Sequence, residues 1–126
     1  MLRRVNFVSI PVTDQDRALA FYRDLMGMEV QTDAPYGDDW RWIFLRIPGA
    51  ETLIQFARAG EVSVSGVPAL VLVSDDVDAE TARLSAAGAT VEDGPADAPW
   101  HAGVRYALIR DSERNLILLQ SSPMET

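Results

Sequence analysis

The chain contains no cysteine and no lysine, and it has a single histidine, His101. Without cysteine there can be no disulfides, thiolate metal sites or thiol catalysis, and without lysine there is no side-chain amine for Schiff-base chemistry. Apolar runs approaching the roughly 20 residues of a membrane-spanning helix are also missing. The N-terminal stretch MLRRVNFVSIPV alternates like a strand and lacks a cleavage site. We therefore expect a cytoplasmic protein.

Positive charge is scarce. The 126 residues include 11 arginines against 19 acidic residues, which gives a net charge of −8. Nucleic-acid partners are not expected, because phosphate backbones require a basic surface. A membrane partner is not expected either. The acidic surface would favour a cationic small ligand, but solubility is the explanation we adopt for it. The 48 % apolar content is typical of a globular domain.

One pattern occurs twice. The stretch TDQDRALAFYRDLMGMEV, residues 13–30, predicts a helix, a glycine stop and a short strand, with Thr13 and Asp16 as an N-terminal capping pair. The stretch SDDVDAETARLSAAGATVED, residues 74–93, has the same order. One apolar strand precedes each helix and two follow the short strand. The sequence therefore predicts an α+β fold of two tandem βαβββ modules, about 3–57 and 67–121, joined by 58–66 within a single domain 1–126.

Alternation along the strands predicts which residues each helix covers. The aliphatic set is assigned to this core: Val8, Ile10, Ile43, Leu45, Ile47, Ile54 and Phe56, then Leu70, Leu72, Val104, Tyr106, Leu108, Ile117 and Leu119. The opposite face mixes aromatic, small and polar residues, including Phe7, Trp40, Trp42, Phe44, Arg46, Gln55, Arg105 and Leu118. We call this the open face. A sheet face of this kind suits a ligand cavity, but it could equally be a dimer surface.

Individual residues on this side remain open to two interpretations. Trp40, Trp42 and Trp100 could stack on a planar or cationic ligand, or they could simply pack at a sheet edge. Arg46 and Arg105 could bind a ligand carboxylate, but solvent exposure or pairing with nearby acids is the interpretation we adopt. His101 is interpreted as an ordinary loop histidine; the alternative is a general base oriented by Asp97.

The paired motifs resemble those of a known family. VTDQDRALAFYRDLMGMEV, its echo DDVDAETARLSAAGATV, and the later series PW, RDSERN and NLILL are similar to the vicinal oxygen chelate superfamily of glyoxalases, bleomycin-resistance proteins and extradiol dioxygenases. The resemblance covers roughly residues 5–121. It implies a curved mixed eight-stranded sheet around a cavity, with one helix outside each half. One departure is DSERN, residues 111–115, where relatives often have Asp-Pro-x-Gly-Asn.

The resemblance also implies where a metal would be bound. Family members typically chelate a divalent metal with one His, Glu or Gln from each of four strands, and these positions correspond to Phe7, Gln55, Ala69 and Leu118. A catalytic metal needs several imidazole or carboxylate ligands, which these residues do not provide. We therefore interpret the chain as a divergent member without the metal ligands, and we expect no metal and no cofactor.

These observations leave three hypotheses for function. The first is metal-independent binding of a small organic compound, of the resistance type, by Phe7, Trp40, Trp42, Phe44, Gln55, Trp100, Arg105 and Leu118. The second is a glyoxalase-like lyase or isomerase, or a dioxygenase, that uses an unrecognised metal site. The third is a non-catalytic dimerising module. No catalytic residue is assigned, so enzymatic activity stays open. A homodimer is expected from the resemblance, because relatives commonly pair subunits.

Overall fold

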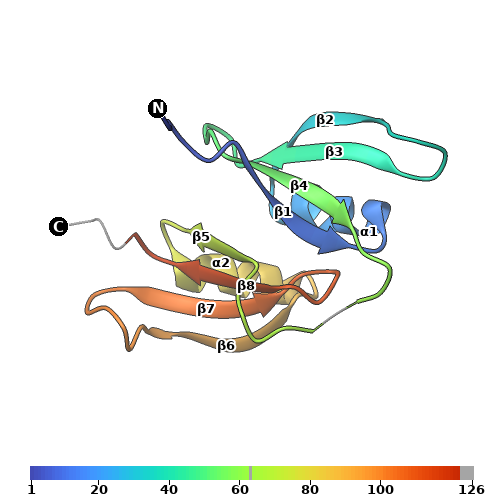
Figure 1. Cartoon of the computed structure of the whole chain (residues 1–126). Helices are drawn as coiled ribbons and strands as arrows, with labels where there is room; N and C mark the ends of the chain where they lie inside the picture. The colour runs from blue at the N-terminus through green and yellow to red at the C-terminus, as the bar shows by residue number, and fades with distance from the viewer. Residues whose placement is uncertain (63, 123–126) are drawn as a thin grey trace. The chain divides into compact units, whose positions relative to one another are not determined.

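The computed structural model describes residues 1–62 and 64–122, and the chain divides into two compact units, residues 1–62 and 63–126. We call them module 1 and module 2 (Figure 1). The division falls inside the expected joint 58–66. Residue 63 of that joint, and residues 123–126 of the expected domain, lie outside the described residues. That the modules make up a single domain stays a prediction.

Each module contains one helical segment and four strands (Figure 1). Module 1 comprises β1 (Phe7–Val12), α1 (Gln15–Leu19), η1 (Ala20–Leu25), β2 (Glu29–Pro35), β3 (Arg41–Arg46) and β4 (Leu53–Arg58). Module 2 comprises β5 (Leu70–Val73), α2 (Val77–Ala86), β6 (Thr90–Asp97), β7 (Arg105–Arg110) and β8 (Leu116–Gln120). The βαβββ order predicted from the repeat is confirmed for both modules.

The two sheets have the same topology. Their strand orders are β1-β4-β3-β2 and β5-β8-β7-β6, with β1 parallel to β4, β5 parallel to β8, and the other neighbours antiparallel. The eight strands therefore form two mixed four-stranded sheets. Among the described residues, none of the helices is long and apolar enough to cross a membrane.

Aspartates cap both helices, and this corrects the predicted role of Thr13. Asp14 has extended backbone angles, and its carboxylate accepts a hydrogen bond from the Arg17 N–H at 3.0 Å. Asp76 accepts from the Ala79 N–H in the same way, also at 3.0 Å. A carboxylate here both satisfies a free N–H and interacts favourably with the positive end of the helix dipole.

The first helix contains a π-helical segment, η1, which α2 lacks. In this segment the Met26 N–H bonds to the Phe21 carbonyl, five residues earlier, at 2.9 Å. The spacing from Asp14 to Gly27 is one residue longer than the spacing from Asp76 to Gly88. One wide turn absorbs that extra residue, so both helices can start at an aspartate and end at a glycine.

The covered core largely matches the predicted set. In module 1 the side chains of Ile10, Ile43, Leu45, Ile54 and Phe56 are buried, together with Ala18, Leu19 and Tyr22 from the helix. Val8 and Ile47, predicted to be buried, are 36 % and 39 % exposed. In module 2, where α2 packs against β6 and β7, Leu70, Ile117 and Leu119 are buried as predicted.

The face assignment of β7 was wrong by one residue. Ala107 and Ile109 lie opposite Leu119 and Ile117 and are fully buried, so they belong to the covered core. Tyr106 and Leu108, predicted to be buried there, lie on the open face. The strand RYALIR has apolar residues at both parities, and alternation alone could not choose between them.

The turn from β7 to β8 is held together by the buried carboxylate of Asp111. Its Oδ1 accepts hydrogen bonds from the backbone N–H groups of Glu113 and Asn115 at 2.8 and 2.7 Å, and its Oδ2 accepts from Asn115 Nδ2 at 3.0 Å. Arg114 has a φ of 64°, at the position where relatives often have glycine. The turn is therefore kept without the usual glycine, because hydrogen bonds to Asp111 hold the left-handed residue in place.

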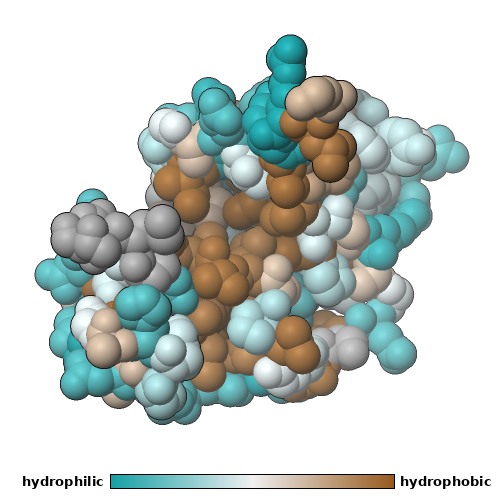
Figure 2. All heavy atoms as spheres, turned by 60° about the vertical axis from the view of Figure 1, so that its left-hand side comes forward, coloured by the Kyte–Doolittle hydropathy of each residue, from teal (hydrophilic) through white to brown (hydrophobic). Residues whose placement is uncertain are grey.

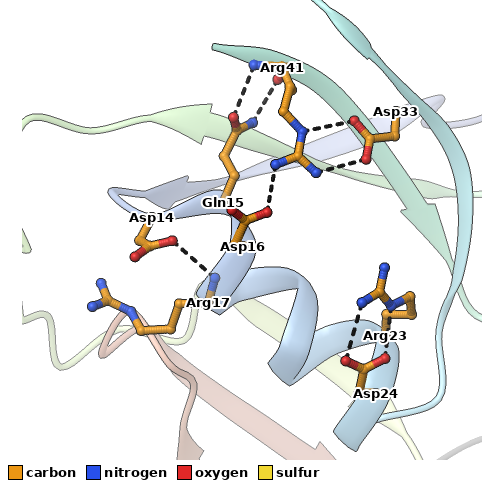
Figure 3. A network of polar contacts seen from close by, with 8 residues as sticks. All are labelled: Asp14, Gln15, Asp16, Arg17, Arg23, Asp24, Asp33 and Arg41. Carbon is orange, nitrogen blue, oxygen red and sulfur yellow. Dashed lines mark hydrogen bonds and ion pairs between the residues drawn. The ribbon is translucent and has the colours of Figure 1, made fainter. Parts of the chain in front are cut away.

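An arginine clamp joins helix and sheet in each module. In module 1 the Arg41 guanidinium binds both oxygens of Asp33 at 3.0 and 2.8 Å and reaches Asp16, in the first turn of α1, at 2.7 Å (Figure 3). In module 2 Arg105 binds both oxygens of Asp78 in α2 at 3.1 and 2.9 Å and reaches Asp97 at 3.2 Å. The repeat thus includes an ion-pair network that apolar patterning did not indicate.

The clamp predicts acid sensitivity. The hydrogen bond from Arg41 lowers the pKa of Asp33, followed by the charge of the same guanidinium. A carboxyl whose pKa is lower in the folded state contributes stability above its unfolded pKa, about 3.9, and loses it as the pH falls through the folded value. We expect Asp33→Asn to lower the free energy of unfolding at pH 7 by about 0.5–1 kcal/mol and to reduce its fall between about pH 4 and 2. Urea titrations across this pH range measure both effects, with the exposed Asp38→Asn as the control. If the free energy of unfolding of Asp33→Asn fell between about pH 4 and 2 as steeply as that of the parent protein, this role would be contradicted.

Candidate functional site

The open face of module 1 carries a row of aromatic rings. Trp42 contacts Tyr36 and Phe44 with ring centroids 5.1 and 5.4 Å apart, and Phe44 contacts Phe7 edge-to-face at 5.1 Å. We call Phe7, Tyr36, Trp42 and Phe44 the aromatic row. Figure 2 shows apolar side chains at the surface as brown areas among polar ones. Phe7 and Trp42 are among the large apolar residues that are exposed to solvent. The row offers a rigid surface for stacking on a flat ligand.

A polar pair lies beside the row on the same sheet face. Gln55 in β4 is opposite both Phe44 in β3 and Ser9 in β1. The Ser9 hydroxyl donates to Gln55 Oε1 at 2.6 Å. That bond fixes the orientation of the amide, and within residues 1–62 and 64–122 no acceptor binds Gln55 Nε2. Gln55 can therefore donate to a ligand that stacks on the row.

Trp40 is not a member of this row. It precedes β3, and its ring lies under the guanidinium of Arg58, 5.1 Å from the centroid, in a cation–π contact. Arg58 also binds Asp39 at 2.5 Å. The two tryptophans predicted as stacking residues therefore have separate contacts: the Trp40 indole lies against Arg58, and the Trp42 indole belongs to the aromatic row.

Module 2 has a smaller aromatic pair on its open face. Trp100 contacts Tyr106 with ring centroids 5.0 Å apart, and Leu108 and Leu118 face each other on neighbouring strands of the same face. The Tyr106 hydroxyl donates to the Asp93 carboxylate at 2.6 Å, and this hydrogen bond raises the pKa of Tyr106. The phenol therefore stays protonated at neutral pH, and its hydroxyl hydrogen is used in the hydrogen bond to Asp93.

Sequence reasoning missed both tyrosines, although the repeat contains the signal. Tyr36 and Trp42 in module 1 correspond to Trp100 and Tyr106 in module 2, each 64 positions later. The two pairs have nearly equal ring separations, 5.1 and 5.0 Å. Aligning the modules residue by residue would have identified a repeated aromatic pair.

Arg105 was predicted to lie on the open face, but it lies on the covered face of the module 2 sheet. It is opposite Asp97 in the ladder and shares its face with Ala107, and its guanidinium is committed to Asp78 and Asp97. A charged residue fits on the covered side because it lies at the start of β7, where its side chain reaches the first turn of α2.

His101 lies at a polar hollow of about 330 Å³ in module 2. The hollow is lined by Ser74, Asp75, His101, Ala102, Gly103, Val104, Ser121 and Ser122. The Nδ1 atom of His101 is 3.0 Å from the Ala102 carbonyl, and a carbonyl only accepts, so Nδ1 carries the hydrogen in this contact. Asp97, considered as an orienting partner, binds Arg105 instead.

Three of the four positions that correspond to family metal ligands lie in strands, and the fourth lies directly before one. Phe7, Gln55 and Leu118 lie in β1, β4 and β8, and Ala69 immediately precedes β5. Within the part of the chain that the structure describes, no three His, Cys, Asp or Glu side chains lie close enough together to hold a metal ion. The absence of a bound metal stays a prediction.

Comparison with known proteins identifies the family. Residues 4–119 match the model of the Glyoxalase/Bleomycin resistance protein/Dioxygenase superfamily. Topology, duplicated modules and this match together show that the chain belongs to that superfamily. The resemblance seen in the sequence is therefore confirmed.

Individual relatives support the same fold. The chain is similar to TnmS3, described as an antibiotic binding protein from Streptomyces sp. CB03234, with 35 % identity, a TM-score of 0.80 and coverage of 95 % of this chain and 96 % of that one. A superfamily member from Sphaerobacter thermophilus has 26 % identity, a TM-score of 0.82 and coverage of 96 % and 98 %. The uncharacterized protein YetH of Bacillus subtilis is 24 % identical over 122 residues, covering 95 % of this chain and 99 % of YetH.

Proposed function

We propose that the protein binds a planar organic compound reversibly and without a metal, using the aromatic row of module 1 as the stacking surface. The observation that carries this proposal is the unbroken ring contact from Tyr36 through Trp42 and Phe44 to Phe7, with the Gln55 amide beside it. Aromatic surfaces with a few fixed polar groups are typical of small-molecule sites. A resistance-type role, in which a compound is sequestered and not converted, fits this arrangement.

A relative supports the ligand class. TnmS3, at 35 % identity over nearly the whole chain, is described as an antibiotic binding protein. In module 2, Trp100 and Leu118 also face the open side, and we propose that they form an apolar contact surface of that module in its own right. Trp40 and Arg105 are left out of the proposed contacts, because Arg58, Asp78 and Asp97 already occupy them.

The proposal predicts binding of a neutral planar probe. N-phenylnaphthylamine fluoresces strongly when it enters an apolar site, and we expect saturable binding that a chelator does not change. Trp42→Ala should weaken binding by about tenfold or more, because it removes the central ring of the row. Fluorescence titration measures the dissociation constant, and circular dichroism checks that the variant is folded.

Trp40→Ala is the matched control, since it removes the same side chain at a site occupied by Arg58. Its affinity for the probe should stay within about twofold of the parent. Chelator-sensitive binding would contradict metal independence. Equal losses in the two variants would place the probe elsewhere.

Two further parts of the proposal concern assembly and location. We propose a homodimer, because relatives of this fold commonly pair subunits and each module presents an open sheet face. Sedimentation equilibrium tests this, and a monomer mass at micromolar concentration would contradict it. We also propose a cytoplasmic location, in keeping with a cysteine-free chain; recovery in a membrane or secreted fraction would contradict it.

A further inference from the structure

A hollow of about 540 Å³ opens beside the aromatic row in module 1. It is lined by Arg4, Asn6, Gln31, Arg46, Gly49, Ala50, Glu51 and Leu53. Leu53 is opposite Phe7 in the ladder, and Arg46 is two residues beyond Phe44 on the same face of β3. The hollow therefore continues the aromatic row at one end, so a ligand stacked on the row can extend a substituent into it.

The duplicated module shows what is unusual about this hollow. Arg46 and Arg110 occupy equivalent positions, opposite Glu29 in β2 and Thr90 in β6, and a β-bulge follows two residues later in each neighbouring strand, at Gln31 and at Glu92. In module 2 Glu92 accepts two hydrogen bonds from Arg110, at 2.7 and 3.1 Å. In module 1 the equivalent residue is the neutral Gln31. The acidic partner of this arginine is thus absent from the bulge of module 1.

Arg46 has not found an equally good partner elsewhere. Its Nε is 3.5 Å from Glu29, at the outer limit of a hydrogen bond, and the other guanidinium N–H groups have no partner within the described residues. By contrast, Arg110 also donates to the carbonyls of Ser65 and Arg114. The Arg46 side chain is 46 % exposed and that of Arg110 is 13 % exposed. Arg46 is available to a ligand, and Arg110 is not.

A second available cation lies at the same hollow. The Arg4 side chain has no hydrogen bond or ion pair to any described residue. Arg46 and Arg4 line this hollow together with Glu51, and Arg46 also pairs with Glu29 at 3.5 Å. The equivalent hollow of module 2, which contains Arg110, balances two arginines against Glu92 and Asp111. Several guanidinium N–H groups of Arg46 and Arg4 have no partner among the described residues and can bind an acidic group, although the chain as a whole is acidic.

We propose that Arg46 and Arg4 form a subsite for an acidic group, so that the ligand of the aromatic row is an aromatic acid. This inference rests on the proposed function and specifies its ligand class. The guanidinium groups would bind a carboxylate or sulfonate through charge-assisted hydrogen bonds, while Gln31 supplies a neutral amide. The ligand class differs from the cationic compound that net charge alone would favour.

Two dyes that share an aromatic skeleton test the subsite. Anilinonaphthalene sulfonate carries an acidic group, and N-phenylnaphthylamine lacks it. We expect the sulfonate dye to bind the protein more tightly, and Arg46→Gln to weaken its binding by roughly three- to tenfold with little effect on the neutral dye. Arg4→Gln should act in the same direction. Arg3→Gln makes the same charge change one residue away and should leave both affinities within about twofold.

The outcomes separate this inference from the proposed function. Binding of both dyes with equal affinity, unaffected by Arg46→Gln, would overturn the acidic subsite and leave the aromatic site intact. Failure of both dyes to bind would overturn the aromatic site, and the subsite with it. An equal effect of Arg3→Gln and Arg4→Gln would show general charge attraction and would also contradict the subsite. Circular dichroism of each variant confirms that affinities are compared between folded proteins.

Discussion

Replacing Asp111 with alanine is expected to lower the free energy of unfolding by about 3 kcal/mol or more, the largest effect we expect for a single polar residue. The substitution removes acceptors from two backbone N–H groups and from the Asn115 amide, all in a buried turn. Hydrogen bonds to a charged group contribute about 1.5–3 kcal/mol each, and buried donors left without acceptors add a desolvation cost. Arg114 would also lose the hydrogen bonds around it that hold its left-handed backbone.

Urea denaturation followed by tryptophan fluorescence and by far-UV circular dichroism measures this loss. Asp38→Ala, which removes an exposed carboxylate in a turn of module 1, is the matched control and should cost less than about 0.5 kcal/mol. If Asp111→Ala cost as little as this control, the turn would not depend on the buried carboxylate.

Replacing Phe56 with alanine is expected to lower the free energy of unfolding by about 3–5 kcal/mol. Phe56 is 1 % exposed and lies against the Tyr22 ring, with centroids 5.9 Å apart. Truncation would leave a cavity between helix and sheet that neighbouring rings, fixed by their own contacts, cannot fill. The transition midpoint in urea should fall while its slope stays nearly constant.

Phe56→Leu provides a graded control, because module 2 has Leu119 at the equivalent place in its core. It should cost about 1–1.5 kcal/mol, since most of the apolar volume is retained. Equal costs for the leucine and alanine variants would show that ring packing, and not cavity size, determines stability here.

Much of the fold could be predicted from the sequence because the pattern occurs twice. The glycine stops and the βαβββ order along the chain agreed between the two copies and were confirmed, whereas the first helix is capped by Asp14 and not by Thr13. The β7 face could not be predicted, because RYALIR has apolar residues at both parities and the deciding residue, Arg105, is charged. What decides its placement is a pair of aspartates, Asp78 and Asp97, which are distant in sequence.

The candidate site was predicted less completely. Phe7, Trp42, Phe44 and Gln55 share one sheet face as the alternation indicated. Trp40 shares the parity of Trp42, but it lies just outside β3, where Arg58 determines its contact. The importance of Arg46 also depends on a bulge at Gln31, and apolar alternation does not reveal bulges.

The π-helical turn in module 1 has a consequence for how this fold can change length. A residue inserted into a strand would turn its later side chains to the opposite face, unless a β-bulge shifts the register with the neighbouring strand. An insertion in this helix is instead absorbed within one turn, between Ala20 and Leu25, and Phe21 and Tyr22 still reach the core. The duplicated modules thus differ in length in two ways: the helix absorbs its extra residue without changing the sheet, whereas the longer β6 has a second register shift in its pairing with β7.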